Sequence, residues 1–384
     1  MIRRTLLFTT LLSATYATAE VPNGGIDGSG RPPPLEFKLG EVTLTLMGRA
    51  QVQAALWVGD DARLSNGEVA EDEGFRLRRA RLGLATEFRG LVVAVEADLL
   101  EADSSVLHEA YVGFKGDWAD GDFLASAGVI KVPMSRSALM SSEALQDGDR
   151  SVVVRGLAPE YQLGFKAAGE VWDDRVRVQV GAFNGLERDV TFSGGWARLD
   201  PGDGNRFGGF AVASRLDLEP IPGTSLLGDG TADLDKRTTA AFGLGGGFLY
   251  NDGPSTTSMA WSADLAFKGW GVGFLAEWLE LSTEPEEKPT QATAVPLETT
   301  SRGLTVQLGY TILKGCLELA ARVDYLDDNT EVEDEGDLLG IAGTLSTFHF
   351  ENRLKVQLYY EHHLELHGSN LDNDVLLLQA EGRF

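Results

Sequence analysis

The chain has 384 residues, of which 43% are hydrophobic, and a formal net charge of −25 at pH 7. An acid excess of this size opposes nucleic-acid binding, which needs a basic surface. The single cysteine, Cys316, excludes an intramolecular disulfide framework. This length is ordinary for one large β-barrel and long for one soluble domain.

The N-terminus has the pattern of a secretory signal peptide over residues 1–19. Arg3 and Arg4 precede an apolar run, and Ala17-Thr18-Ala19 forms a small-residue cleavage site before Glu20. Residues 20–40 are rich in glycine and proline, so we expect a flexible periplasmic lead-in there. The remaining residues, 41–384, are expected to form the folded domain.

The folded domain reads as strands with one apolar and one polar face. No later segment has 18 uninterrupted apolar residues, so no transmembrane helix is expected. From Val42 to Trp57, apolar residues alternate with threonine, glutamine and Arg49. This alternation is typical of an outer-membrane strand with its apolar side toward lipid. Only helices and closed barrels satisfy their backbone polar groups in lipid, so the prediction is a barrel.

Similar strands recur along the whole domain and predict a 16-stranded antiparallel transmembrane β-barrel, an even number as this class requires. The expected strands are roughly 41–57, 75–87, 90–101, 105–116, 122–132, 158–170, 174–185, 207–219, 237–250, 258–268, 270–281, 301–312, 315–326, 337–350, 353–363 and 373–384. Long and short connections alternate between them, which predicts short periplasmic turns and long extracellular loops. The long connection at 220–236 lies on the short side and breaks the alternation.

The stretch FRLRRARLGL, residues 75–84, is the most cationic of the strands. Strand alternation places Arg79 and Arg81 on the lumen face and Arg76 and Arg78 on the other, where we expect contacts with lipopolysaccharide or an interface. Two interpretations of the lumen arginines stay open. They either act on permeating ions directly or simply pair with carboxylates of the wall.

Basic residues slightly outnumber acidic ones on the assigned lumen faces, whereas the acid excess lies in turns and loops such as 327–337. A positive lumen favours anions, because rings of arginine or lysine select them. An acidic outer rim suits divalent cations that bridge to lipopolysaccharide. Acidic loops that dominate the entrance would instead give a general or weakly cation-selective pore.

Ordered motifs along the chain are similar to those of the phosphate-selective porins O and P. They are FRLRRARLGL (75–84), EADLL (96–100), HEAYVGFKG (108–116), SAGVIKVPMS (126–135), LAPEYQLGFKAAGEV (157–171) and VGAFNG (180–185), with the terminal Phe384. The resemblance implies a homotrimer in the bacterial outer membrane, with a third extracellular loop folded into the lumen and small inorganic anions, phosphate above all, as solutes.

The resemblance also implies a constriction lined by arginine, lysine and hydroxyl groups. The matching residues are Arg49, Arg79, Arg81, Lys131, Ser135 and Arg136. Guanidinium groups make charge-assisted, often bidentate bonds to phosphate oxygens, and lysine adds a point charge.

Other functions find less support in the sequence. The histidines at 362, 363 and 367 hint at a metal site, but we interpret them as a chance cluster. The glycine run 243–247 lacks the lysine and helix of a phosphate loop and indicates a bend or close packing instead. We expect no cofactor and no catalytic residue, although a plugged or enzymatic outer-membrane barrel is an alternative.

Overall fold

The computed structural model describes residues 35–59, 73–100, 107–118, 121–172, 175–186, 196, 209–221, 226, 230–254, 256–285, 298–334, 336–369 and 371–384. The expected signal peptide and most of the expected lead-in lie outside these residues.

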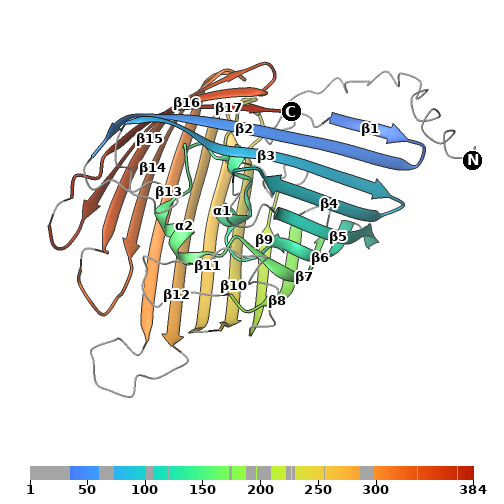
Figure 1. Ribbon diagram of the computed structural model, residues 1–384, viewed down its shortest axis with the longest axis horizontal. Coiled ribbons are helices and arrows are strands. Elements are labelled where there is room, and N and C mark those ends of the chain that lie inside the picture. Colours follow the sequence, from blue (N-terminus) through green and yellow to red (C-terminus); the bar gives the residue numbers. More distant parts are fainter. Residues whose placement is uncertain are drawn as a thin grey trace, which may run out of the picture.

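Within the described residues, strands β2 to β17 close into an antiparallel barrel of 16 strands, as the sequence predicts (Figure 1). Each strand pairs with its neighbours in the chain, and the ring closes where β17 pairs with β2. The strands are β2 (Val42–Val58), β3 (Gly74–Phe88), β4 (Leu91–Asp98), β5 (Leu107–Trp118), β6 (Gly121–Lys131), β7 (Tyr161–Val171), β8 (Val176–Asn184), β9 (Phe210–Leu218), β10 (Ala241–Asp252), β11 (Thr256–Gly269), β12 (Val272–Pro285), β13 (Thr299–Leu313), β14 (Leu317–Asp327), β15 (Leu338–His349), β16 (Leu354–Glu365) and β17 (Val375–Arg383).

A further short strand, β1 (Leu35–Leu39), precedes the barrel and pairs with the start of β2. It lies in the last residues of the range expected as a lead-in. Gly40, with φ of +65°, turns the chain between the two strands. Phe384 exchanges two backbone hydrogen bonds with Gly48, two residues beyond Leu46, the partner of Leu35 at the start of β1.

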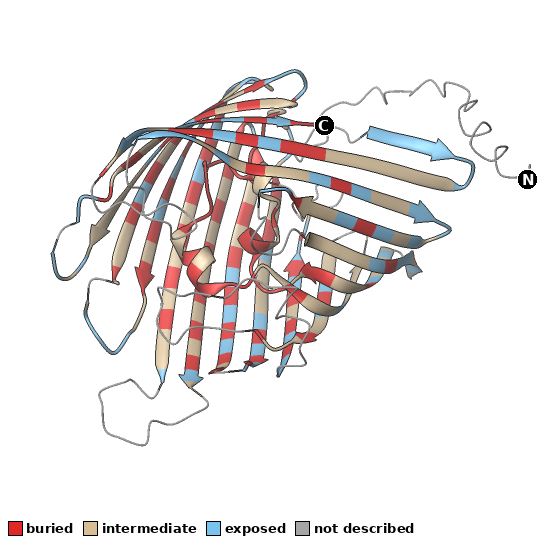
Figure 2. Cartoon of the chain, viewed as in Figure 1, coloured by how far each residue is buried: buried red, intermediate tan, exposed pale blue. Residues whose placement is uncertain are grey.

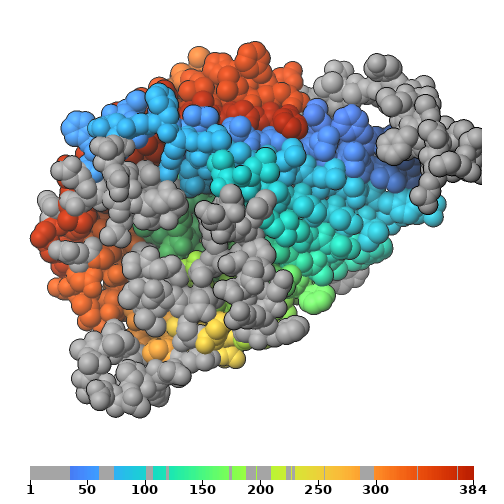
Figure 3. Space-filling view, viewed as in Figure 1, coloured from blue at the N-terminus to red at the C-terminus, as the bar shows by residue number. Residues whose placement is uncertain are grey.

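The barrel wall is apolar outside and polar inside, and successive residues alternate in burial (Figure 2). On β17, Leu378 is 42% exposed, whereas Gln379 and Glu381 face inward and are only 2% and 1% exposed. An exposed apolar band of this extent is stable only in contact with lipid. From the side of β2 to β6 the outer wall is continuous (Figure 3).

Tight turns close one end of the barrel. In the connections Arg89-Gly90 and Trp270-Gly271 both residues have positive φ, of 50° and 84° and of 56° and 83°. Such two-residue turns match the twist of antiparallel strands. At this same end, β9 and β10 are joined by the much longer stretch 219–240. No helix among the described residues is long and apolar enough to cross a membrane.

Candidate functional site

The connection between β6 and β7, residues 132–160, folds inside the barrel (Figure 1), and we call it the inner segment. It contains α1 (Arg136–Leu139), the 3-10 helix η1 (Ser142–Ala144) and α2 (Val152–Leu157). Its Met134 and Val153 belong to one buried cluster with Leu249 and Leu279 of the inner wall. The segment is therefore packed against the wall and does not hang free in the lumen.

Two serines begin the helices of the inner segment. The Ser135 hydroxyl accepts a hydrogen bond from the amide of Ala138 at 3.1 Å, and the Ser151 hydroxyl accepts one from the amide of Val153 at 3.1 Å. Serine is favoured at this position because it satisfies an amide that the first turn leaves unpaired. Ser135, predicted as a constriction hydroxyl, is fully buried in this capping role.

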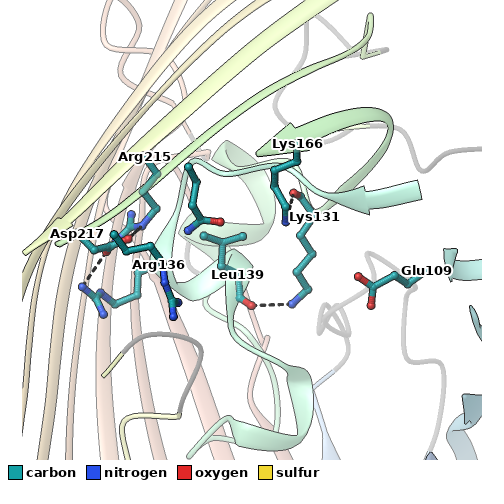
Figure 4. Close-up of a pocket in the computed structure, with 9 residues that line it drawn as sticks. Glu109, Lys131, Arg136, Leu139, Lys166, Arg215 and Asp217 are labelled. Carbon is teal, nitrogen blue, oxygen red and sulfur yellow. Dashed lines mark hydrogen bonds and ion pairs between the residues drawn. The ribbon is translucent and has the colours of Figure 1, made fainter. Parts of the chain in front are cut away.

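Lys131 fixes the other end of α1. Its ammonium donates to the carbonyl oxygens of Ala138, Leu139 and Met140 at 3.2, 2.9 and 2.7 Å (Figure 4). These carbonyls are the acceptors that a helix end leaves unsatisfied, and a cation there is stabilised. Part of the positive charge of Lys131 is thus used to hold the inner segment to β6.

Arg136 joins the inner segment to the opposite wall. Its guanidinium contacts Asp264 at 2.5 Å and Asp217 at 3.0 Å, and its backbone amide donates to Glu277 at 2.7 Å. Arg215 completes the network with 2.6 Å contacts to Asp217 and Asp264. The two guanidinium groups thus share two buried carboxylates, and such a network is stable only while every charge keeps a partner.

The cationic strand β3 contains a register shift. Arg79 pairs with Gln51, but Val52 pairs with Leu77, so Arg78 is an extra residue without a partner across the strands. An insertion of this kind, a β-bulge, re-aims the side chains next to it. The strict alternation between lumen-facing and outward-facing side chains therefore stops at Arg78.

The prediction that Arg76 and Arg78 face away from the lumen is wrong for this reason. Arg76 donates to the lumen residue Gln53 at 2.7 Å, and Arg78 forms an ion pair with Asp149 of the inner segment at 3.2 Å. Arg79 approaches the same carboxylate at 4.0 Å. The side chains of all the arginines of this strand therefore make contacts on the lumen side.

Burial alone would raise the pKa of Asp149, but the nearby charges of Arg78 and Arg79 outweigh it and lower the pKa to about 2. The carboxylate is therefore ionised in the folded protein throughout the physiological range. Its ion pair with Arg78 links the middle of the inner segment to β3.

The lowered pKa of Asp149 predicts that the stability of the folded protein depends on pH. Because the folded pKa lies below the unfolded value of 3.8, the contribution of Asp149 is complete above about pH 4 and is lost as the pH falls toward 2. At neutral pH the shift corresponds to about 2 kcal/mol. Asp149→Asn should unfold at a lower temperature at pH 7, and its difference from the unchanged protein should shrink below pH 4. A difference that stays constant from pH 7 to 2 would contradict this assignment.

Arg49 and Arg81 complete the basic wall of β2 and β3. Arg49 donates to the hydroxyl of Ser142 in η1 at 2.8 Å. Arg81 forms ion pairs with Asp98 at 2.9 Å and Glu96 at 3.3 Å. Of the two interpretations left open by the sequence, pairing with wall carboxylates describes the contacts of Arg81.

Sequence reasoning missed the residues that hold the middle of the inner segment. Asp147 pairs with Arg322 of β14 at 3.1 Å, and Gln146 donates to Glu318 at 2.6 Å. Asp147 also accepts from the hydroxyl of Thr344 at 2.8 Å. The only signal for them is a polar Gln-Asp-Gly-Asp run, 146–149, in the middle of the loop.

A cavity of about 190 Å³ lies between the inner segment and the wall of β5 to β9 (Figure 4). It is lined by Glu109, Lys131, Arg136, Leu139, Lys166, Arg177, Gln179, Arg215 and Asp217. The structure thus brings Lys131 and Arg136 together here. Arg49 and Arg79 instead contact the inner segment from β2 and β3, and Ser135 does not line the cavity.

Comparison with known families bears directly on this arrangement. Residues 51–213 match the family of phosphate-selective porins O and P. The match confirms, over those residues, the resemblance seen in the sequence. The match and the closed barrel together place the chain in the outer membrane of a bacterium.

Solved structures share the fold of this chain at low sequence identity. OmpF of Salmonella typhi in complex with daunomycin has a TM-score of 0.58 and 13% identity, over 91% of this chain and 100% of that chain. OmpT of Vibrio cholerae gives 0.57 and 14%, over 91% and 100%. An anion-selective porin from Comamonas acidovorans gives 0.54 and 11%, over 90% and 100%. A search of curated proteins found no match.

Proposed function

We propose that this porin passively conducts small hydrophilic solutes and prefers anions, with phosphate as its principal solute. The cavity beside the inner segment is the observation that supports the proposal. Its lining contains five cationic side chains and two carboxylates. The cations are Lys131, Lys166, Arg136, Arg177 and Arg215, and the carboxylates are Glu109 and Asp217.

The arrangement of these charges suits a moving anion. Arg136 and Arg215 are neutralised largely by their own carboxylates, whereas Lys166 donates to a backbone carbonyl, that of Lys131, at 3.2 Å. Charges beside low-dielectric walls act more strongly than in bulk water, so a local excess of cations attracts anions. Several moderate contacts also let the ion leave again, which conduction requires.

A general or weakly cation-selective porin is the alternative, and the ion pairs favour it. Arg81 and Arg136 each contact two carboxylates, so their charges are compensated within the wall. The acidic loop 327–337 also lies between β14 and β15, at the end opposite the tight turns. A negative entrance there would enrich cations before they reach the cavity.

The remaining parts of the proposal rest on the sequence and the family match. They are a signal peptide at 1–19, a periplasmic lead-in at 20–40 and a barrel domain over 41–384. They also include a homotrimer, contacts of the rim with lipopolysaccharide, and the inner segment as the third extracellular loop and constriction. We propose no enzymatic activity and no cofactor.

The zero-current potential under a salt gradient in a planar bilayer tests the ion preference. We expect anion selectivity, and we expect added phosphate to block chloride current. Lys166→Gln should shift the potential toward cations, because it removes one cation from the cavity lining. Lys314→Gln, in the exposed turn between β13 and β14, is the matched control and should leave the potential unchanged.

The measured ion selectivity distinguishes an anion-preferring porin from a general or weakly cation-selective one. Cation selectivity in the unchanged protein would overturn the anion preference and leave the porin function standing. Anion selectivity without phosphate block would keep the preference and remove phosphate as the principal solute.

A further inference from the structure

The connection between β9 and β10, residues 219–240, is long although it lies at the end of tight turns. Its described residues Glu219, Leu226 and 230–234 are buried. Thr231 is 5% exposed, Asp233 1% and Leu234 4%. A connection that only joined two strands through the periplasm would be exposed to water. This one is packed into the end of the barrel.

Its second half is hydrogen-bonded to two of the tight turns. The carboxylate of Asp233 accepts from the amide of Gly271 at 2.7 Å, and its carbonyl accepts from the hydroxyl of Thr311 at 2.9 Å. The carbonyl of Leu234 accepts from the amide of Gly315 at 2.9 Å. The connection is therefore fixed across the ends of β11 to β14.

Its first half contacts the inner segment. The hydroxyl of Thr231 donates to the side-chain carbonyl of Gln146 at 2.5 Å. Leu226 lies in a buried cluster with Met140 and Leu145 of the inner segment and Leu275 of β12. The inner segment is thus held from the end of the barrel as well as from the wall.

The space around the inner segment is correspondingly uneven. On the side of β13 and β14, the space lined by Thr305, Met140 and Leu145 measures about 20 Å³, room for about one water molecule. On the side of β5 to β9, the cavity measures about 190 Å³. Solutes of more than a few atoms fit only the second.

We propose that the β9–β10 connection is a brace that holds the inner segment against β11 to β14 and thereby confines permeation to the side of β5 to β9. The brace acts as a positioning element, because it touches the constriction and not the solute. This inference rests on the proposed porin function. It makes Leu226 and Thr231 determinants of the permeation path, although neither residue lines the cavity.

Thiol accessibility during single-channel recording tests the inference. In a Cys316→Ser background, a cysteine replaces either Gln179, which lines the larger cavity, or Thr305, which lines the small space. The cationic reagent MTSET is then added. We expect stepwise block of the Gln179→Cys channel and no reaction of the Thr305→Cys channel.

The brace is then weakened in the Thr305→Cys channel. Leu226→Ala removes the apolar contact with the inner segment and should raise the reaction rate of the thiol by about tenfold or more. Leu216→Ala is the matched control, because Leu216 is 46% exposed on the outer face of β9, and it should change nothing. Thr231→Val, which removes only the hydrogen bond to Gln146, serves if Leu226→Ala does not fold.

The thiol-accessibility recordings can overturn the proposal in three ways. Equal reaction of the two thiols in a conducting channel overturns the confined path while leaving the porin function intact. A Thr305→Cys thiol that does not react with MTSET in any of the brace variants overturns the role of the brace. A Cys316→Ser parent that conducts no ions overturns the porin function, and this inference with it.

Discussion

Arg136→Gln is expected to lower the unfolding temperature of the barrel more than any other single substitution in the lumen. The arginine is 5% exposed and holds Asp264 and Asp217, whose side chains are fully buried. Removing one partner of a buried charge network leaves the others uncompensated and costs about 3–5 kcal/mol. The inner segment loses its attachment to β9 and β11 at the same time.

Heat-induced unfolding followed on gels measures the stability, and single-channel recording measures the attachment. We expect earlier unfolding, noisier current and closure at lower voltage. Arg89→Gln is the control, because its ion pair with Glu41 is exposed and contributes little. Adding Asp264→Asn to Arg136→Gln should restore part of the stability, since it removes one unpaired charge. An Arg136→Gln protein that unfolds like the unchanged protein would show that the network does not hold the segment.

The second large effect is expected from Gly247→Ala on β10. A Cβ atom at this position would lie 2.1 Å from the carbonyl oxygen of Met134 in the inner segment. That carbonyl also accepts hydrogen bonds from Arg215 at 3.0 Å and Ser262 at 2.8 Å, so it cannot move without losing them. Overpacking of this kind costs about 1–3 kcal/mol, and the displaced segment should change the single-channel conductance.

Gly343→Ala on β15 makes a clean comparison, because a Cβ atom there meets nothing within 4 Å. The two variants carry the same chemical change in strands of the same barrel. Equal unfolding temperatures and equal conductance for both would show that the inner segment does not lie against β10 as described.

The strands could be predicted because their signal is local. Each strand places one face toward lipid and the other toward the lumen, so alternation alone marks β2 and its successors. The family match over 51–213 confirms the resemblance that FRLRRARLGL and the following motifs carry. The glycine run 243–247 also indicated close packing, but nothing in it showed which segment packs there.

The partners of the lumen charges could not be predicted from the sequence. Arg136 and Asp264 are 128 residues apart, and they meet only because the barrel closes and the inner segment turns inward. The inward direction of Arg78 depends on a register shift between β2 and β3, which exists only once the strands are paired. The burial of residues 230–234 likewise follows from contacts with turns distant in sequence, such as those of Gly271 and Gly315.

The short strand β1 has a consequence for how the ring closes. The edge of β2 that faces β17 is used along its whole length, because β1 pairs with residues 42–46, Phe384 bonds Gly48, and β17 pairs with residues 49–58. A strand that slips by two residues keeps its faces correct, so alternation alone would permit such an error. Here a slip of β17 toward the tight-turn end would drive Phe384 into β1. The pairing of β1 with β2 therefore leaves β17 no room to shift toward the tight-turn end.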